Sequence, residues 1–166
     1  IRLMMAKNFP EIKAETIVTS VSGIIRMEDI FSRYRPDYVF HAAAYKHVPM
    51  MENNPSESIE NNVYGTKILD MAVKYGVKKF VMISTDKAVN PTNVMGCSKR
   101  ICEIYVQSLD HAIKTGKIKG ITQFVTTRFG NVLGSNGSVI PLFKRQIKAG
   151  GPVTVTEPNI IRFFML

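Results

Sequence analysis

The sequence contains little cysteine and no long apolar run. Its 166 residues include two cysteines, Cys97 and Cys102, and two thiols five residues apart form neither a disulfide framework nor a metal-ligand spacing. We interpret both as reduced core thiols in the cytosol. No apolar run approaches the roughly 18 residues of a membrane-spanning helix, and residues 1–5 resemble part of an amphipathic helix rather than a secretory signal. These absences favour a cytoplasmic domain without a metal centre.

Acidic residues are also scarce relative to basic ones. The chain has 13 Asp and Glu against 22 Lys and Arg, a net charge of +9, and such an excess favours anionic ligands or surfaces. Solvated helix ends and turns explain the excess equally well, because they hold Lys74, Lys78, Lys79, Lys114, Lys117 and Lys119. Aromatic and basic residues are not interleaved as in nucleic-acid-binding proteins, so we expect no nucleic-acid partner.

The length and composition allow one domain with a substantial core, because 45% of the residues are hydrophobic. Short β-branched or apolar runs predict strands at residues 15–20, 38–41, 80–83 and 121–127, with a turn and a strand at 150–156. Helical spacing predicts helices at residues 1–9, 27–34, 56–76, 95–112 and 139–148. This alternation predicts an α/β fold with a parallel sheet.

A group of polar residues follows the apolar run at residues 80–83. Ser84, Thr85, Asp86 and Lys87 stand together there, and open α/β sheets bind ligands at the carboxyl ends of their strands. The sequence therefore predicts a ligand site at this position rather than a solvated loop.

The next helix brings two more side chains to the same place. Residues 90–93 predict a turn, because proline fixes φ and asparagine tolerates turn angles. Met95 and Lys99 then lie one turn apart on one face of a helix. We expect the strand end and this helix face to direct five side chains into one pocket: Thr85, Asp86, Lys87, Met95 and Lys99.

Several unusual motifs occur in a fixed order along the chain. They are His41 to Pro49, Asn62 to Thr66, Ser84 to Lys87, Ala88 to Pro91, Met95 with Lys99, and Arg128 to Val132. In this order they resemble the extended short-chain dehydrogenases/reductases and, more narrowly, the bacterial polysaccharide-biosynthesis nucleotide-sugar 4,6-dehydratases. The resemblance covers most of residues 36–158 and is far more specific than a Tyr-x-x-x-Lys pattern alone.

The resemblance implies a partial Rossmann fold of the α/β class, a doubly wound parallel sheet with helices on both faces. Residues 1–150 would form part of an NAD(P)-binding domain, and residues 151–166 would begin the substrate-binding region. The family's Gly-x-x-Gly-x-x-Gly loop is missing, so we expect a chain truncated at both ends that lacks the first strand and its glycine-rich loop. Loss of that central strand would separate the strands at 15–20 and 38–41 and expose a sheet edge. We therefore expect weak or no cofactor binding by this chain alone.

The resemblance also implies NAD or NADP as cofactor and a UDP-sugar as substrate. Cofactor contacts are expected from Ala42, Ala43, Ala44, Lys46, Ser84, Thr85, Lys99 and Val132. Substrate contacts are expected from Lys46, His47, Asn131, Ser138, Val139 and Arg162. Full-length relatives include membrane-anchored members, for which the cytoplasmic face of the inner membrane is the expected location, and we expect a homo-oligomer.

The residues expected to contact ligands at 42–46, Ser138 and His47 also have interpretations that involve no catalytic role. Residues 42–46 are equally consistent with a tight packing turn and an exposed lysine. Ser138 would be the N-cap of a surface helix in any case, and only the resemblance assigns a diphosphate to it. His47 has neither a second metal ligand at a suitable spacing nor a nucleophile partner, so we expect substrate contact or positioning from it rather than catalysis.

The implied reaction is 4,6-dehydration of a UDP-N-acetylhexosamine in bacterial polysaccharide biosynthesis. The oxidised cofactor would take a hydride from C4 of the sugar, Lys87 would remove the C5 proton, and Asp86 would protonate the leaving C6 hydroxyl. A lysine acts as a base near neutral pH only if burial or a positive neighbour, here Lys99, lowers its pKa. Thr85 completes the expected catalytic set.

Met95 separates this chain from most short-chain enzymes, which carry tyrosine at the matching position. A thioether has no proton to exchange, so the C4 hydroxyl would lose its proton to an ordered water or to Asp86. Some membrane-anchored dehydratases carry methionine at this position, whereas a C4 epimerase would be expected to carry tyrosine. A core methionine, a nucleotide-sugar epimerase and a truncated nucleotide-sugar-binding module without activity are the alternatives. The choice between NAD and NADP, the hexosamine and inversion at C5 stay open.

Overall fold

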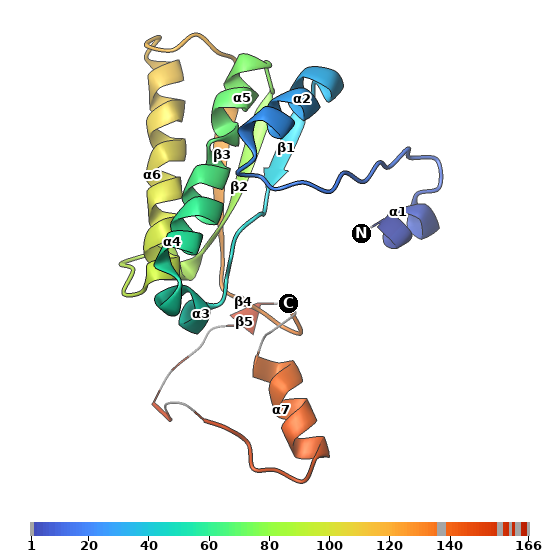
Figure 1. Ribbon diagram of the computed structural model, residues 1–166, viewed down its shortest axis with the longest axis vertical. Helices are drawn as coiled ribbons and strands as arrows, with labels where there is room; N and C mark the ends of the chain where they lie inside the picture. The colour runs from blue at the N-terminus through green and yellow to red at the C-terminus, as the bar shows by residue number, and fades with distance from the viewer. Residues whose placement is uncertain (1, 136–138, 156–157, 160, 162–163, 166) are drawn as a thin grey trace.

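A three-stranded parallel sheet forms the centre of the molecule. The computed structural model describes residues 2–135, 139–155, 158–159, 161 and 164–165 (Figure 1). The strands are β1 (Tyr38–His41), β2 (Lys79–Thr85) and β3 (Gln123–Phe129), in the spatial order β1-β2-β3. His41 lies beside Met82, and Thr85 lies beside Phe129. The predicted parallel α/β sheet is confirmed, with each of these strands within two residues of its predicted bounds.

Helices connect the strands and pack on the sheet. α2 (Ile24–Tyr34) precedes β1, and α6 (Val94–Lys114) joins β2 to β3. Between β1 and β2 the chain forms α3 (Val48–Asn53), α4 (Pro55–Ser58), a π-helix (Ile59–Tyr64) and α5 (Ile68–Lys74). Right-handed crossovers between parallel strands that follow chain order place their helices on one face of the sheet.

The hydrophobic core lies on that face. Phe80 and Met82 of β2 are fully buried in one cluster with Leu69 of α5 and Val106 of α6. Burial of such side chains contributes about 1.5–3 kcal/mol each to folding. The core therefore holds β2 and α6, which carry most of the predicted site, in a fixed relation to each other.

The opposite face of the sheet is open in the described part of the chain. Tyr38 and Phe40 of β1 are 60% and 71% exposed, and Val125 of β3 is 41% exposed. Helices α2, α5 and α6 all contribute to the core cluster on the other face. The described residues thus form one half of a doubly wound arrangement, and the second helical layer of the predicted fold is not found among them.

Two predicted strands are wrong. Residues 13–20 form no strand, and Val18 is 96% exposed. Residues 151–155 likewise form no strand. A strand is stabilised by backbone hydrogen bonds to a neighbouring strand, and no strand among the described residues pairs with either segment. A short second sheet forms instead between β4 (Asn131–Val132) and β5 (Phe164–Met165).

Several helix details also differ from the prediction. α2 begins at Ile24 rather than at residue 27. The helix predicted to start at Ser56 starts one residue earlier, because Pro55 occupies the first turn, where its fixed φ is favourable. Cys102 is buried as predicted, but Cys97 is exposed, since it lies on the solvent side of α6.

Two helices lie apart from the sheet (Figure 1). α1 (Arg2–Asn8) precedes the irregular segment that leads to α2, and α7 (Val139–Lys148) follows β4. The bounds of α7 agree with the helix predicted at residues 139–148. No helix in the described ranges combines the length and apolar character needed to span a bilayer.

Candidate active site

A cavity of about 410 Å³ opens at the carboxyl ends of the three main strands. Its walls come from the loop after β1, the end of β2, the start of α6, residues 129–135, Val139 at the start of α7 and Phe164 of β5. This is the edge at which open α/β sheets bind ligands. The cavity therefore forms where the sequence predicted a site.

Most of the residues predicted for the site line this cavity. They are Ala42, Ala44, Lys46, His47, Ser84, Thr85, Lys87, Met95, Lys99, Asn131, Val132 and Val139. Ala43 and Asp86 are not part of the lining. Ala43 stands between two alanines that do line the cavity. Ser138 and Arg162 lie outside the described residues.

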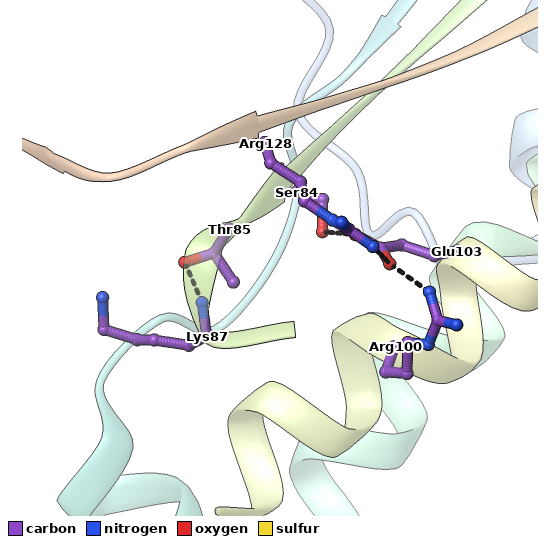
Figure 2. A network of polar contacts seen from close by, with 6 residues as sticks. All are labelled: Ser84, Thr85, Lys87, Arg100, Glu103 and Arg128. Atoms are coloured by element: carbon purple, nitrogen blue, oxygen red, sulfur yellow. Dashed lines mark hydrogen bonds and ion pairs between the residues drawn. The ribbon is translucent and has the colours of Figure 1, made fainter. Parts of the chain in front are cut away.

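Asp86 is linked to the cavity by hydrogen bonds from Thr85 and Lys87, which both line it. β2 ends at Thr85, whose Oγ accepts a hydrogen bond from the Lys87 N–H at 3.3 Å (Figure 2). The Thr85 hydroxyl and the Lys87 ammonium each donate to Asp86 Oδ1 at 2.9 Å. Burial raises the pKa of Asp86, but these hydrogen bonds outweigh burial and hold the pKa below its ordinary value. Asp86 and Lys87 therefore form an ion pair at neutral pH.

Lys99 projects from α6 into the same cavity. Asn93 caps this helix by accepting a hydrogen bond from the Gly96 N–H at 2.8 Å. Met95 and Lys99 follow on the buried face and are 3% and 5% exposed. Within the described part of the chain the Lys99 ammonium makes no hydrogen bond or ion pair, and burial lowers its pKa. Lys99 is largely buried and lines the cavity, so its ammonium is placed to donate to an oxygen-rich ligand.

The first turn of α6 packs directly on the turn that carries Lys87. A Cβ added at Gly96 would lie 2.4 Å from the carbonyl oxygen of Lys87. Real Cβ atoms do not come so close to backbone, so only glycine allows this approach. The contact places Lys87 and Lys99 on two walls of one cavity.

A buried carboxylate supports the strand ends behind the cavity (Figure 2). Glu103 of α6 is fully buried and accepts hydrogen bonds from Ser84 Oγ at 2.7 Å and from Arg128 Nε and Nη2 at 2.8 and 2.6 Å. Arg100 donates to it at 2.9 Å. Burial raises the pKa of Glu103, but the bonds from Arg128, Ser84 and Arg100 bring it down to about 2. The network ties β2, β3 and α6 together.

Sequence reasoning missed Glu103. The available signal was its position four residues after Lys99, on the buried side of an amphipathic helix. His41 was also assigned no role of its own. It is 3% exposed, its Nε2 lies 3.2 Å from Thr66 Oγ1, and burial and the charge of Lys99 lower its pKa to about 4.

Comparison with known proteins identifies the relatives of the chain. The family model described as polysaccharide biosynthesis protein matches residues 2–166. The capsular polysaccharide biosynthesis protein CapD of Staphylococcus aureus is 55% identical over 150 residues, which are 90% of this chain and 24% of that protein. The UDP-glucose 4-epimerase of Rickettsia canadensis is 49% identical over 132 residues, 78% of this chain and 37% of the epimerase.

Solved structures share the fold. Pen from Bacillus thuringiensis superposes with a TM-score of 0.86 at 35% identity, over 99% of this chain and 49% of that one. The UDP-glucose 4-epimerase of Thermotoga maritima, solved with UDP-glucose, has a TM-score of 0.80 at 25% identity, over 95% and 57% of the two chains. WbmG of Bordetella bronchiseptica, solved with NAD, has a TM-score of 0.66 at 25% identity, over 81% and 44%. The chain belongs to the polysaccharide biosynthesis protein family, and its fold is the Rossmann-like fold predicted from the sequence.

Proposed function

We propose that the protein is an NAD(P)-dependent enzyme that modifies a UDP-sugar, and that its reaction is 4,6-dehydration of a UDP-N-acetylhexosamine. One observation carries the proposal. Lys99, a largely buried lysine whose ammonium makes no hydrogen bond or ion pair with the described residues, lines the same cavity as Lys87, and Lys87 is paired with Asp86. A cation for ligand oxygens and an acid–base pair are the two parts that this chemistry needs.

The cavity suits one part of a nicotinamide dinucleotide. Ala42 and Ala44 have small side chains that let a ligand approach the backbone, and Lys99 would donate to a hydroxyl or phosphate oxygen of the ligand. The sequence contains no glycine-rich phosphate loop, so these residues would hold only the nicotinamide side. When bound, the cofactor would accept a hydride from the sugar and return it. The structures with UDP-glucose and with NAD support this pair of ligands.

The acid–base pair would carry the elimination. Oxidation at C4 of the sugar would transfer a hydride to the cofactor and the hydroxyl proton to an ordered water. Lys87 would then take the C5 proton, and Asp86 would give a proton to the C6 hydroxyl, which leaves as water. Hydride would then add at C6, and Lys87 would return a proton to C5, which together would yield a 4-keto-6-deoxy sugar. These roles need a neutral amine and a neutral acid, whereas the free protein holds an ion pair.

Transfer of one proton from Lys87 to Asp86 would convert the ion pair of the free protein into the neutral amine and acid that the reaction needs. The Lys87 ammonium donates to Asp86 Oδ1 at 2.9 Å, and transfer along this bond converts the ion pair into the amine and the acid. The Asp86 side chain is 46% exposed. A sugar that covers it would remove water, and loss of water favours the neutral pair because desolvation penalises both charges.

A nucleotide-sugar epimerase is the second candidate. It is supported by the 49% identity with a protein named UDP-glucose 4-epimerase. Met95 lines the cavity where most short-chain enzymes place a tyrosine, and its thioether cannot exchange a proton with the C4 hydroxyl. This position favours the dehydratase.

Product analysis decides between the two. The full-length protein is incubated with UDP-N-acetylglucosamine and NAD⁺, and the sugar is followed by NMR. A 4-keto-6-deoxy product supports dehydration, and inversion at C4 with the C6 hydroxyl retained supports epimerisation. Asp86→Asn and Lys87→Ala should abolish dehydration. Asp37→Asn, at an exposed ion pair with Lys78 at the other end of the sheet, is the matched control and should keep it. Unchanged turnover in both site variants would exclude the acid–base roles.

A further inference from the structure

Glu52 of α3 caps the neighbouring helix α6. Its Oε1 accepts a hydrogen bond from the Val94 N–H at 2.6 Å, across 42 residues of chain. Val94 is the first residue of α6, and the first turn of α6 contains no acidic residue of its own. A carboxylate is favourable at the amino end of a helix, where N–H groups lack partners within the helix. A different element of the fold therefore supplies the negative charge at this helix end.

α3 itself is joined to the loop after β1, which forms one wall of the cavity. The helix directly follows His47, and the Met51 N–H donates to the His47 carbonyl at 3.0 Å. His47 and Val48 both line the cavity, whereas Glu52 is not part of the lining. Met51 is 6% exposed and directly precedes Glu52. A shift of Glu52 would therefore be passed to this wall through the helix.

The capped turn of α6 belongs to another wall of the cavity. Met95, which lines the cavity, directly follows Val94. Asn93 Oδ1 accepts a hydrogen bond from the Gly96 N–H at 2.8 Å, so two side chains together satisfy the first and third N–H groups of the helix. Gly96 in turn packs on the Lys87 carbonyl oxygen and leaves no room there for a Cβ. The position of this turn therefore determines where the Lys87 turn can lie.

The origin of the Glu52 carboxylate separates its effect on geometry from its effect on stability. A negative charge at a helix amino end contributes about 0.3–1 kcal/mol wherever it comes from. An acidic residue within α6 would supply this stability and would affect that helix alone. Glu52 also fixes α3 relative to α6, and these two elements carry residues of different cavity walls.

We propose that Glu52 is a positioning residue that sets the separation between the wall at His47 and Val48 and the α6 turn that carries Met95 and packs on Lys87. This inference rests on the proposed function, because these walls would hold the sugar against the acid–base pair. A misplacement of 1 Å can lower a rate by about 100-fold. Glu52 would therefore affect turnover from outside the cavity.

Three variants of the full-length protein test this role. Glu52→Ala removes the acceptor for the Val94 N–H. Glu52→Gln loses the charge but keeps a side-chain oxygen that can accept the same hydrogen bond. Glu28→Ala is the matched control, because the Glu28 carboxylate also joins two helices: it accepts from Lys74 and, at 3.1 Å, from the Tyr75 hydroxyl. Tyr75 lies just before β2, at the opposite end of that strand from the cavity.

We expect Glu52→Ala to lower kcat with UDP-N-acetylglucosamine and NAD⁺ by about 10- to 100-fold and to change KM little. Glu52→Gln should restore most of the lost kcat, and Glu28→Ala should keep kcat at a comparable loss of thermal stability.

Amide hydrogen exchange gives a second measurement that does not depend on activity. Loss of a cap that acts on α6 alone would speed exchange only in the first turn of α6. Under the proposal, exchange in Glu52→Ala should also become faster at Met51 of α3 and at Val89, whose N–H donates to the Asp86 carbonyl at 3.0 Å in the Lys87 turn. Both amides should exchange as in the unmodified protein in Glu28→Ala.

Unchanged kcat in Glu52→Ala, an equal loss of kcat in Glu28→Ala, or exchange that is faster only in the first turn of α6 would overturn the proposal. If the unmodified protein binds neither NAD⁺ nor the UDP-sugar, the proposed function fails. Exchange then still decides the matter: faster exchange at Met51 and Val89 in Glu52→Ala supports the positioning of the two walls by Glu52, and unchanged exchange refutes it.

Discussion

Arg128 at the end of β3 forms a two-pronged ion pair with Glu103 in the middle of α6. Nε donates to Oε1 at 2.8 Å and Nη2 donates to Oε2 at 2.6 Å. Glu103 also accepts a hydrogen bond from Ser84 at the end of β2. The two strand ends that border the cavity are therefore joined to each other through one buried carboxylate.

Removal of this carboxylate charge should destabilise the fold. We expect Glu103→Gln to lower the free energy of unfolding by roughly 2–4 kcal/mol, less than for a fully buried pair because the Arg128 side chain is 41% exposed. Urea denaturation measures the effect. Glu28→Gln, at the exposed pair with Lys74, is the control and should change stability by less than about 1 kcal/mol. Equal losses in both variants would contradict a supporting role for Glu103.

A methyl group at residue 96 should separate α6 from the Lys87 turn. Gly96→Ala would gain about 1 kcal/mol of helix propensity, yet its Cβ would lie 2.4 Å from the Lys87 carbonyl oxygen. We expect a net loss of about 1–3 kcal/mol from overpacking, measured by thermal unfolding. Cys97→Ala, at the exposed neighbouring position, should leave stability nearly unchanged. A stabilised Gly96→Ala protein would show that the Lys87 turn moves away from the added methyl group without a loss of stability.

Stability should fall between pH 6.5 and about pH 4 because of His41. Burial and the charge of Lys99 lower its pKa from 6.5 to about 4 in the folded protein. The unfolded chain therefore takes up a proton over this range and the folded protein does not, so stability decreases as the pH falls. A shift of this size corresponds to roughly 3 kcal/mol. Urea denaturation at pH 7.5 and 5.0 measures the slope.

The matched variant for this measurement is His41→Gln, which lacks the titrating ring. Its stability should depend less on pH over the same interval, whereas His111→Gln, on α6 outside the buried cluster, should keep the slope of the unmodified protein. A slope that persists in His41→Gln would assign the effect to other groups.

Replacement of Lys99 should raise the stability of the free protein and weaken ligand binding. Lys99 is 5% exposed and its ammonium makes no hydrogen bond or ion pair within the described ranges, so Lys99→Met removes a largely buried charge and should stabilise the free protein by about 1–2 kcal/mol. Under the proposed function it should also weaken NAD⁺ binding, measured by isothermal titration. Lys114→Met, at an exposed pair with Asp110, should change neither. A destabilised Lys99→Met protein would indicate that the ammonium has a stabilising partner.

Local sequence patterns were sufficient where a segment's structure depends on its own residues. Periodicity placed β1 and α7 at their observed bounds and put Met95 and Lys99 on one buried helix face. Patterns failed where a partner was needed, as for residues 15–20, whose β-branched composition could not form a strand without a neighbour.

The sequence by itself determined the family, the parallel sheet and the grouping of polar residues after β2, because these depend on the order of motifs and on the spacing of apolar side chains. Only the tertiary structure decided that Asp86 reaches the cavity through Lys87, that Glu103 joins two strand ends, and that Glu52 of α3 caps α6. Each of these depends on which polar groups meet, and hydrogen bonds between segments tens of residues apart leave no periodic trace in the chain.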